Sequence, residues 1–149
     1  MAASFVKFQL GMGDILGATA LNLSTDALKL ALTNTTPVSH EGAWHYFSSL
    51  TEISASNGYS AGGATLMMTT ATDSSGTWSV NAAAANPTWT STTGSMGPFE
   101  WIVLYDSTPA SNKTLFGYWD YGSALTLNGS NGDTLTVTFS VAGVPMQFA

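Results

Sequence analysis

The densest group of side chains that could do chemistry lies at residues 40–45, which read His-Glu-Gly-Ala-Trp-His. A metalloprotease helix needs two histidines four residues apart on one face, with a glutamate directly after the first. Here His40 and His45 are five residues apart, and Gly42 weakens any helix between them. We therefore expect no metal ion at this segment, and no cofactor elsewhere in the chain.

The same segment carries aromatic side chains that are unfavourable to expose to water. Trp44, Tyr46 and Phe47 lie within four residues, and aromatic side chains are typical of the centres of protein interfaces. A plain surface loop is the alternative to a contact loop for a partner. We favour the contact loop and predict an interface at Trp44, His45, Tyr46 and Phe47.

Pairs of acidic residues are the second candidate for chemistry. A glycosidase needs two carboxylates that face each other across a sugar, and Glu100 and Asp120 lie on segments that we expect to pair as strands. The simpler interpretation, which we prefer, places each acid at a solvated strand edge or in a hydrogen bond to a loop. Two histidines and many serines supply the residue types of a serine triad, but their presence alone does not indicate one. We predict that the chain is not an enzyme and has no catalytic residues.

The composition argues against several classes of partner. Only 8 % of the residues are charged, against about 25 % in an average globular domain. Three lysines, no arginine and a net charge of −6 make binding to nucleic acid or to an anionic membrane unexpected. Cysteine is absent, which excludes disulfides and thiolate chemistry. So little surface charge suits a protein that is largely covered in an assembly.

The dominant pattern along the chain is the two-residue period of β-strands. Residues 133–141 alternate apolar and hydroxyl side chains, as in a half-buried strand. Residues 99–105 are apolar on both faces, with Phe99 and Trp101 expected on the same face, which predicts a central strand. Further strands are expected at 27–33, 64–70, 77–81 and 88–91, helical turns at 14–20, a helical turn or strand at 47–53, and a break at 93–98.

Residues 115–121 are strongly aromatic and should pair with residues 99–105 as a long hairpin. Phe116 and Tyr118 are expected on one face of this strand, with Trp119 and Tyr121 on the other. These rings fit a sugar-binding platform or a core, and we prefer the core. With about eight short strands and minimal helix, we predict an all-β fold: a single-domain β-sandwich over residues 1–149, jelly-roll-like in its topology.

The order of several segments is informative once the elements are placed. The segments are Ser4–Leu10, Asp26–Pro37, Leu50–Ala64, Gly97–Asp106, Leu115–Ser123 and Gly132–Val137. In this order they resemble a group of small virion proteins of tailed bacteriophages that includes capsid decoration, or cement, proteins. The resemblance covers nearly the whole chain. The stretch at residues 40–47 is longer and more aromatic than expected for that group.

The resemblance implies a structural virion protein, made in the host cytoplasm, that binds the outer capsid surface where major capsid protein subunits meet. It also implies a homo-oligomer, either a dimer or a trimer, that follows the symmetry axes of the lattice. Three alternatives stay open. They are a tail or baseplate structural protein, a host-glycan-binding β-sandwich module that uses Trp44 or Trp119, and a hydrolase with an acid pair.

Overall fold

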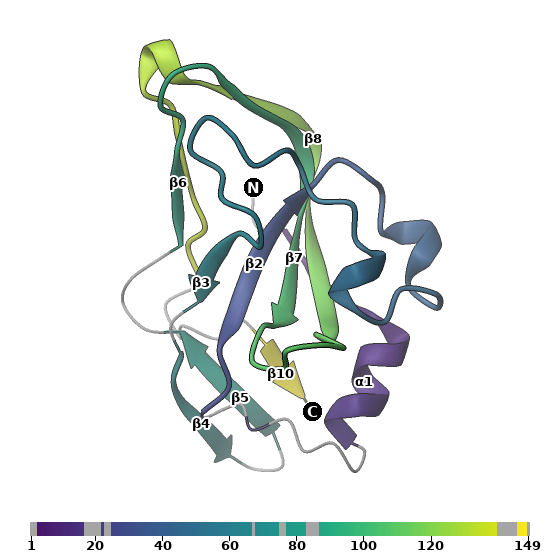
Figure 1. Cartoon of the computed structure of the whole chain (residues 1–149). Coiled ribbons are helices and arrows are strands. Elements are labelled where there is room, and N and C mark those ends of the chain that lie inside the picture. Colours follow the sequence, from purple (N-terminus) through teal and green to yellow (C-terminus); the bar gives the residue numbers. More distant parts are fainter. Residues whose placement is uncertain are drawn as a thin grey trace.

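The computed structural model describes residues 3–16, 22, 25–66, 68–74, 77–82, 87–139 and 146–148, and strands dominate it (Figure 1). The described residues form ten strands and one α-helix, so the all-β prediction is confirmed. The strands are β1 (Phe5–Lys7), β2 (Leu28–Thr33), β3 (Ala64–Leu66), β4 (Met68–Ser74), β5 (Thr77–Ala82), β6 (Thr88–Thr90), β7 (Ser95–Asp106), β8 (Leu115–Asn128), β9 (Thr134–Thr136) and β10 (Met146–Phe148). The helix is α1 (Gln9–Leu16), and short 3₁₀ helices lie at Val38–His40, Phe47–Ser49 and Gly129–Asn131.

The strands form antiparallel sheets that give a sandwich-like arrangement. The largest sheet has the order β1-β8-β7-β2-β3, a second has the order β10-β5-β4, and β6 pairs with β9. One residue separates β3 from β4, yet β3 pairs with β2 and β4 pairs with β5, so the chain passes there from one sheet to the next. The finer expectation of a jelly roll stays a prediction.

The predicted long hairpin is confirmed as the pair β7 and β8, which run side by side in Figure 1. The predicted break at residues 93–98 holds only at residues 93 and 94, because β7 begins at Ser95 and pairs Met96 with Leu127. An irregularity between Met96 and Phe99 accommodates Pro98. Proline has no N–H to donate to the ladder and is tolerated in sheets at such positions.

Two clusters of buried side chains cover opposite faces of the five-stranded sheet. One contains Leu28, Leu30, Leu32, Phe99, Ile102, Leu104 and Phe116 among others, and the second contains Phe8, Trp44, Leu50, Trp101, Val103, Tyr105, Leu115 and Tyr118 among others. The central, doubly covered strand is therefore confirmed as β7. Its second face is covered by Phe8, which directly precedes α1, and by Trp44, Phe47 and Leu50 of the loop that follows β2. Figure 1 shows this loop beside the sheet.

Two predicted face assignments are wrong because of bulges in the central hairpin. Phe99 packs in the cluster opposite to that of Trp101, since the register between β7 and β8 shifts between these two residues. Phe116 and Tyr118 likewise lie in different clusters. The register shifts again at Tyr105, which pairs with Leu115 and leaves Phe116 as the extra residue. An extra residue reverses the alternation of side chains beyond it.

The remaining predictions differ at the ends of elements. The helix begins at Gln9 rather than Asp14, and residues 17–20 of its expected range lie outside the described residues. The ambiguous segment at 47–53 is a 3₁₀ turn followed by extended chain, with Glu52 bridged to Thr33. Only Thr134–Thr136 of the expected strand at 133–141 is a strand, and residues 140 and 141 are not described.

Candidate functional site

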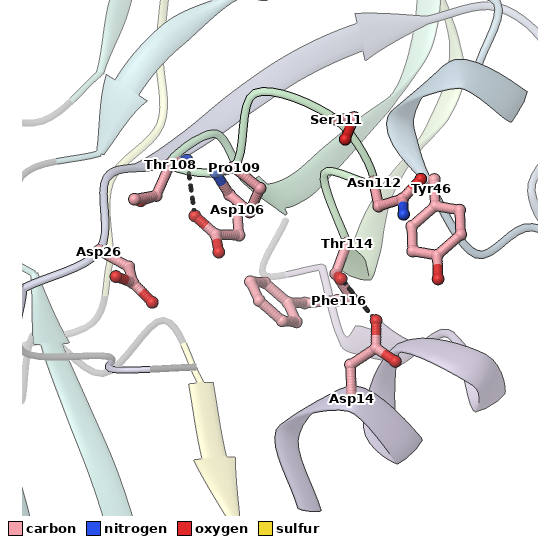
Figure 2. A pocket seen from close by; sticks show the side chains of 10 residues that line it. All are labelled: Asp14, Asp26, Tyr46, Asp106, Thr108, Pro109, Ser111, Asn112, Thr114 and Phe116. Atoms are coloured by element: carbon pink, nitrogen blue, oxygen red, sulfur yellow. Dashed lines mark hydrogen bonds between the residues drawn. The ribbon is translucent and has the colours of Figure 1, made fainter. Parts of the chain in front are cut away.

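A pocket of about 400 Å³ lies beside the helix, and three of the residues that line it are aspartates (Figure 2). Its walls come from α1, from the chain that enters β2, and from the loop between β7 and β8. The lining residues are Asp14, Asp26, Tyr46, Asp106, Thr108, Pro109, Ser111, Asn112, Thr114 and Phe116. We call this site the acidic pocket.

The position of Asp14 follows from the close packing of α1 on the end of β8. A Cβ atom at Gly11 would meet the carbonyl oxygen of Leu115 at 1.9 Å, so only glycine permits this approach. One helical turn later, Asp14 Oδ2 accepts a hydrogen bond from the Thr114 hydroxyl at 2.6 Å. The same oxygen lies 2.9 Å from His45 Nε2. Asp14 therefore ties the helix both to the loop at His45 and to the end of the β7–β8 loop.

Asp26 and Asp106 come together because antiparallel strands bring their opposite ends to one edge. Asp26 lies two residues before β2, Asp106 is the last residue of β7, and Leu28 pairs with Asp106. Asp26 Oδ2 accepts a hydrogen bond from the Asn22 N–H at 2.7 Å. Asp106 Oδ1 accepts one from the Thr108 N–H at 2.8 Å. Backbone donors thus hold both carboxylates in place.

The electrostatic environment of Asp106 is unfavourable for its negative charge. The residue is only 5 % exposed. Burial raises the pKa of its carboxyl group above the ordinary value, and the nearby charge of Asp26 raises it further, while hydrogen bonds from Thr108 act in the opposite direction. Within the described residues the one ion pair is that of His45 with Asp14, so neither Asp26 nor Asp106 has a cationic partner there.

The four predicted contact residues do not form an exposed loop in the structure. Trp44 is only 8 % exposed, stacks on His40 with ring centroids 4.5 Å apart, and belongs to the core cluster of Phe8. An exposed anchor at Trp44 is therefore wrong, because the loop folds back and buries the indole against the sheet. The interface at residues 44–47 stays a prediction, with the Trp44 side chain buried beneath the surface of this segment.

The other three predicted contact residues are half-buried. His45 stacks on Tyr46 at 3.8 Å, and Phe47 stacks on Tyr105 at 4.3 Å. Tyr46 also lines the acidic pocket, as Figure 2 shows. The predicted segment therefore contributes to the site through Tyr46 and through the contact of His45 with Asp14.

The acid pair and the sugar platform, which the sequence analysis considered as alternatives, lie outside the acidic pocket. Asp120 pairs with Trp101, and its carboxylate accepts a hydrogen bond from the N–H of Gly122 at 2.7 Å. Neither Glu100 nor Asp120 lines the acidic pocket. Trp119 is half-buried and contacts the rings of Phe5 and Phe139 at 4.7 and 5.9 Å, which fits the preferred interpretation as core.

A short sequence pattern that our sequence reasoning missed occurs at residues 58–62. Gly-Tyr-Ser-Ala-Gly matches the Gly-X-Ser-X-Gly pattern of a nucleophile elbow, which places its serine on a turn from a strand to a helix. Here the segment is a turn that leads into β3, and Ser60 is exposed. The Tyr59 hydroxyl donates to Glu52 Oε2 at 2.7 Å. The segment therefore fastens a loop and lacks the elbow geometry.

Sequence reasoning also missed the acidic pocket, although a signal for two of its members was present. Asp26 directly precedes one predicted strand and Asp106 directly follows another. An antiparallel pairing of these strands places both acids at the same edge. Asp14 carried no comparable signal, because its position depends on how α1 packs.

Searches for a matching protein-family model, curated protein or solved structure each return no match for this chain. In the part of the chain that the structure describes, no group of three or more His, Cys, Asp or Glu side chains is arranged to hold a metal ion. No helix there is long and apolar enough to cross a membrane.

Proposed function

We propose that this chain is a structural virion protein that decorates the outer surface of a major capsid lattice and stabilises the head. The resemblance of six segments, in their order along the chain, is the starting point. The single observation that carries the proposal is the division of β8 into a buried half and an exposed half. Leu115–Tyr118 are buried, whereas Asp120–Ala124 are exposed.

The exposed half of β8 (Asp120–Ala124) has the properties of a contact surface. It continues directly from core residues, but Tyr121–Ala124 pair with no residue of β7, because the register between β7 and β8 shifts between Phe99 and Trp101. Asp120 is its one charged residue. Tyr121 is its largest side chain and is 51 % exposed, and tyrosine is enriched among residues that dominate binding energy.

Attachment through such a surface relies on apolar and backbone contacts rather than on charge. A single small contact of this kind binds weakly, but several contacts to neighbouring capsid subunits add to stable binding. A homo-oligomer would multiply the contacts at a symmetry axis of the lattice. The proposed partners are therefore the major capsid protein and further copies of this chain.

Particles that lack this protein provide the test. Addition of the purified chain should raise the temperature at which the particles release their DNA, because bound copies oppose the outward pressure of the packaged DNA. Tyr121→Ser should weaken attachment by roughly tenfold or more, since an aromatic side chain at an interface centre often contributes about 2 kcal/mol. Thr65→Ser, exposed on β3 at the other edge of the sheet, is the matched control and should attach normally.

Equal DNA-release temperatures for bare and decorated particles would show that the stabilising role is wrong. Cryo-electron microscopy of intact particles separates the remaining structural alternative. Density on the head lattice supports the proposal. Density confined to the tail or baseplate replaces it with the tail assignment.

A further inference from the structure

The acidic pocket has no role in the contacts proposed so far. We propose that it receives the ammonium or guanidinium group of a lysine or arginine side chain supplied by the capsid partner. This inference rests on the proposed function and assigns to the partner a basic side chain that enters the pocket. The occupant is thus a cationic side chain at the end of an alkyl stem.

The charge of the pocket is complementary to that of a cationic side chain. Three carboxylates line the pocket, and the chain has only three lysines and no arginine to balance them. None of the lysines lines the pocket. Lys7 lies on β1, where it pairs with Gly117, and Lys29 lies on β2, opposite Tyr105. Lys113 follows the lining residue Asn112 in the β7–β8 loop but does not itself line the pocket. Asp14 has His45 beside it, whereas Asp26 and Asp106 have no cationic partner among the described residues, so a basic side chain from a partner would complement these two acids.

The carboxylate oxygens of the pocket are arranged as hydrogen-bond acceptors for a cationic group. Asp14 and Asp26 each use Oδ2 for the hydrogen bonds that fix their positions. Their Oδ1 atoms accept no hydrogen bond from the described residues. The donors to Asp106 all come from Thr108, and Figure 2 shows the second oxygen of this buried carboxylate directed toward the pocket. Acceptors that are held in place before binding suit the several N–H donors of an ammonium or guanidinium group.

The volume and the lining of the cavity suit a single long side chain. Its volume of about 400 Å³ lies near the lower end of the range of about 300–1,000 Å³ for small-ligand sites. It therefore suits one side chain better than a long polymer. Phe116, Pro109 and Tyr46 supply apolar surface in the lining. Lysine and arginine bury their alkyl stems on such surface while the charged group reaches polar partners.

The burial of Asp106 explains why a cation would be favoured over a neutral group. The raised pKa of Asp106 reflects poor solvation and repulsion from Asp26. A bound cation relieves both effects and lowers that pKa again, so binding should weaken as the pH falls and Asp106 takes up a proton. A neutral ligand relieves neither.

The binding chemistry can be tested on the isolated protein with N-acetyl-L-arginine amide as the probe. Titration followed by ¹H–¹⁵N NMR should give saturable shifts at the amides of Thr108 and Thr114. N-acetyl-L-citrulline amide has the same shape without the charge and should shift them at least tenfold more weakly. Asp106→Asn should weaken arginine binding at least fivefold. Glu100→Gln removes the same charge away from the pocket and is the matched control, which should bind like the wild type.

Three outcomes would overturn the pocket chemistry. Equal binding of the arginine and citrulline probes would show that charge is not recognised. Normal arginine binding by Asp106→Asn, or equal weakening by Glu100→Gln, would show that the probe does not use the pocket. Saturable shifts of the pocket amides with calcium chloride and none with arginine would assign the site to a metal cation instead.

Attachment to particles distinguishes failure of this inference from failure of the proposed function. Asp106→Asn should attach at least fivefold more weakly than the wild type, whereas Glu100→Gln should attach normally. If the wild type and Asp106→Asn attach equally, the capsid role stands and the inserted basic side chain is wrong. If the wild type does not attach at all, the capsid role is wrong and no capsid side chain fills the pocket.

Discussion

The segment of residues 38–53, which covers one face of the main sheet, and the acidic pocket beside it hold the same chemical group in different surroundings. In the covering segment, Glu41 accepts a hydrogen bond of 2.6 Å from the Tyr118 hydroxyl. Glu52 accepts one from the Tyr59 hydroxyl at 2.7 Å and one from the Gly62 N–H at 2.8 Å. In the pocket, Asp26 and Asp106 accept backbone N–H groups of nearby residues in the chain, and three carboxylates line one cavity.

The difference separates carboxylates that fasten loops to core tyrosines from carboxylates that gather around a cavity. The loop-fastening acids have neutral tyrosine donors from the core, and burial and the adjacent carboxylate raise the pKa values of Tyr59 and Tyr118 above the ordinary range. Burial also raises the pKa of Tyr105 to about 12, and its hydroxyl donates to the carbonyl of Gly62. The covering segment therefore belongs to the folded core, and the pocket is where three carboxylates lie around one cavity.

The largest expected effect tests whether the covering segment is core. Trp44→Ala should lower the free energy of unfolding by about 3–5 kcal/mol, because it removes a buried indole and leaves a cavity. Urea unfolding followed by circular dichroism measures it. Val38→Ala, at a side chain that is 59 % exposed, is the control and should change stability by less than about 0.5 kcal/mol. A loss below about 1 kcal/mol for Trp44→Ala would return this residue to the surface.

A smaller effect tests the fastening hydrogen bonds. Tyr59→Phe removes the donor to Glu52 and the acceptor for the buried Leu32 N–H, which lies 3.2 Å from the hydroxyl. We expect a loss of about 1–3 kcal/mol in the free energy of unfolding, because both partners stay partly buried without a replacement. Tyr121→Phe removes a hydroxyl from an exposed ring and should be neutral. Equal effects of the two variants would contradict the fastening role.

The smallest effect concerns the pocket itself. Asp106→Asn should leave stability at pH 7 unchanged or raise it by less than about 1 kcal/mol, since it removes a poorly solvated charge and keeps an acceptor for Thr108. Because the folded-state pKa of Asp106 is raised, the folded protein binds the proton more tightly than the unfolded chain. Wild-type stability from this group therefore increases as the pH falls through the raised pKa.

The difference between wild type and Asp106→Asn should accordingly shrink between pH 7 and pH 4. Urea unfolding of both proteins at several pH values in this range measures it. A variant that is strongly destabilised at every pH would mean that the Asp106 carboxylate fastens the loop, as Glu52 does, and the distinction between the two regions would fail.

The strands were predictable because burial on a sheet follows a two-residue period that side-chain types report directly. The pairing of β7 with β8 and the double coverage of β7 both follow from apolar runs near a polar loop. The bulges at Phe99 and Phe116 were not predictable, because an extra residue in one strand becomes apparent only against its partner. For that reason the sequence put Phe99 on the same face as Trp101.

The site was less accessible to sequence reasoning than the fold. An aromatic loop that folds back on a sheet and one that projects into solvent have the same composition. The sequence therefore predicted Trp44 as a contact residue, although its side chain is buried in the core. Asp26 and Asp106 could have been joined through the ends of their strands. The third member, Asp14, depends on the contact of Gly11 with Leu115, which is a matter of packing and leaves no pattern in the chain.

The long β7–β8 hairpin also has a mechanical consequence. In an antiparallel pair the cross-strand hydrogen bonds run perpendicular to the strands. A force that pulls the two strands past each other therefore loads many of these bonds at once, whereas a force that peels one strand away breaks them one after another. If copies of this chain carry tension along that axis, the same domain that yields readily to peeling should resist stretching far more strongly.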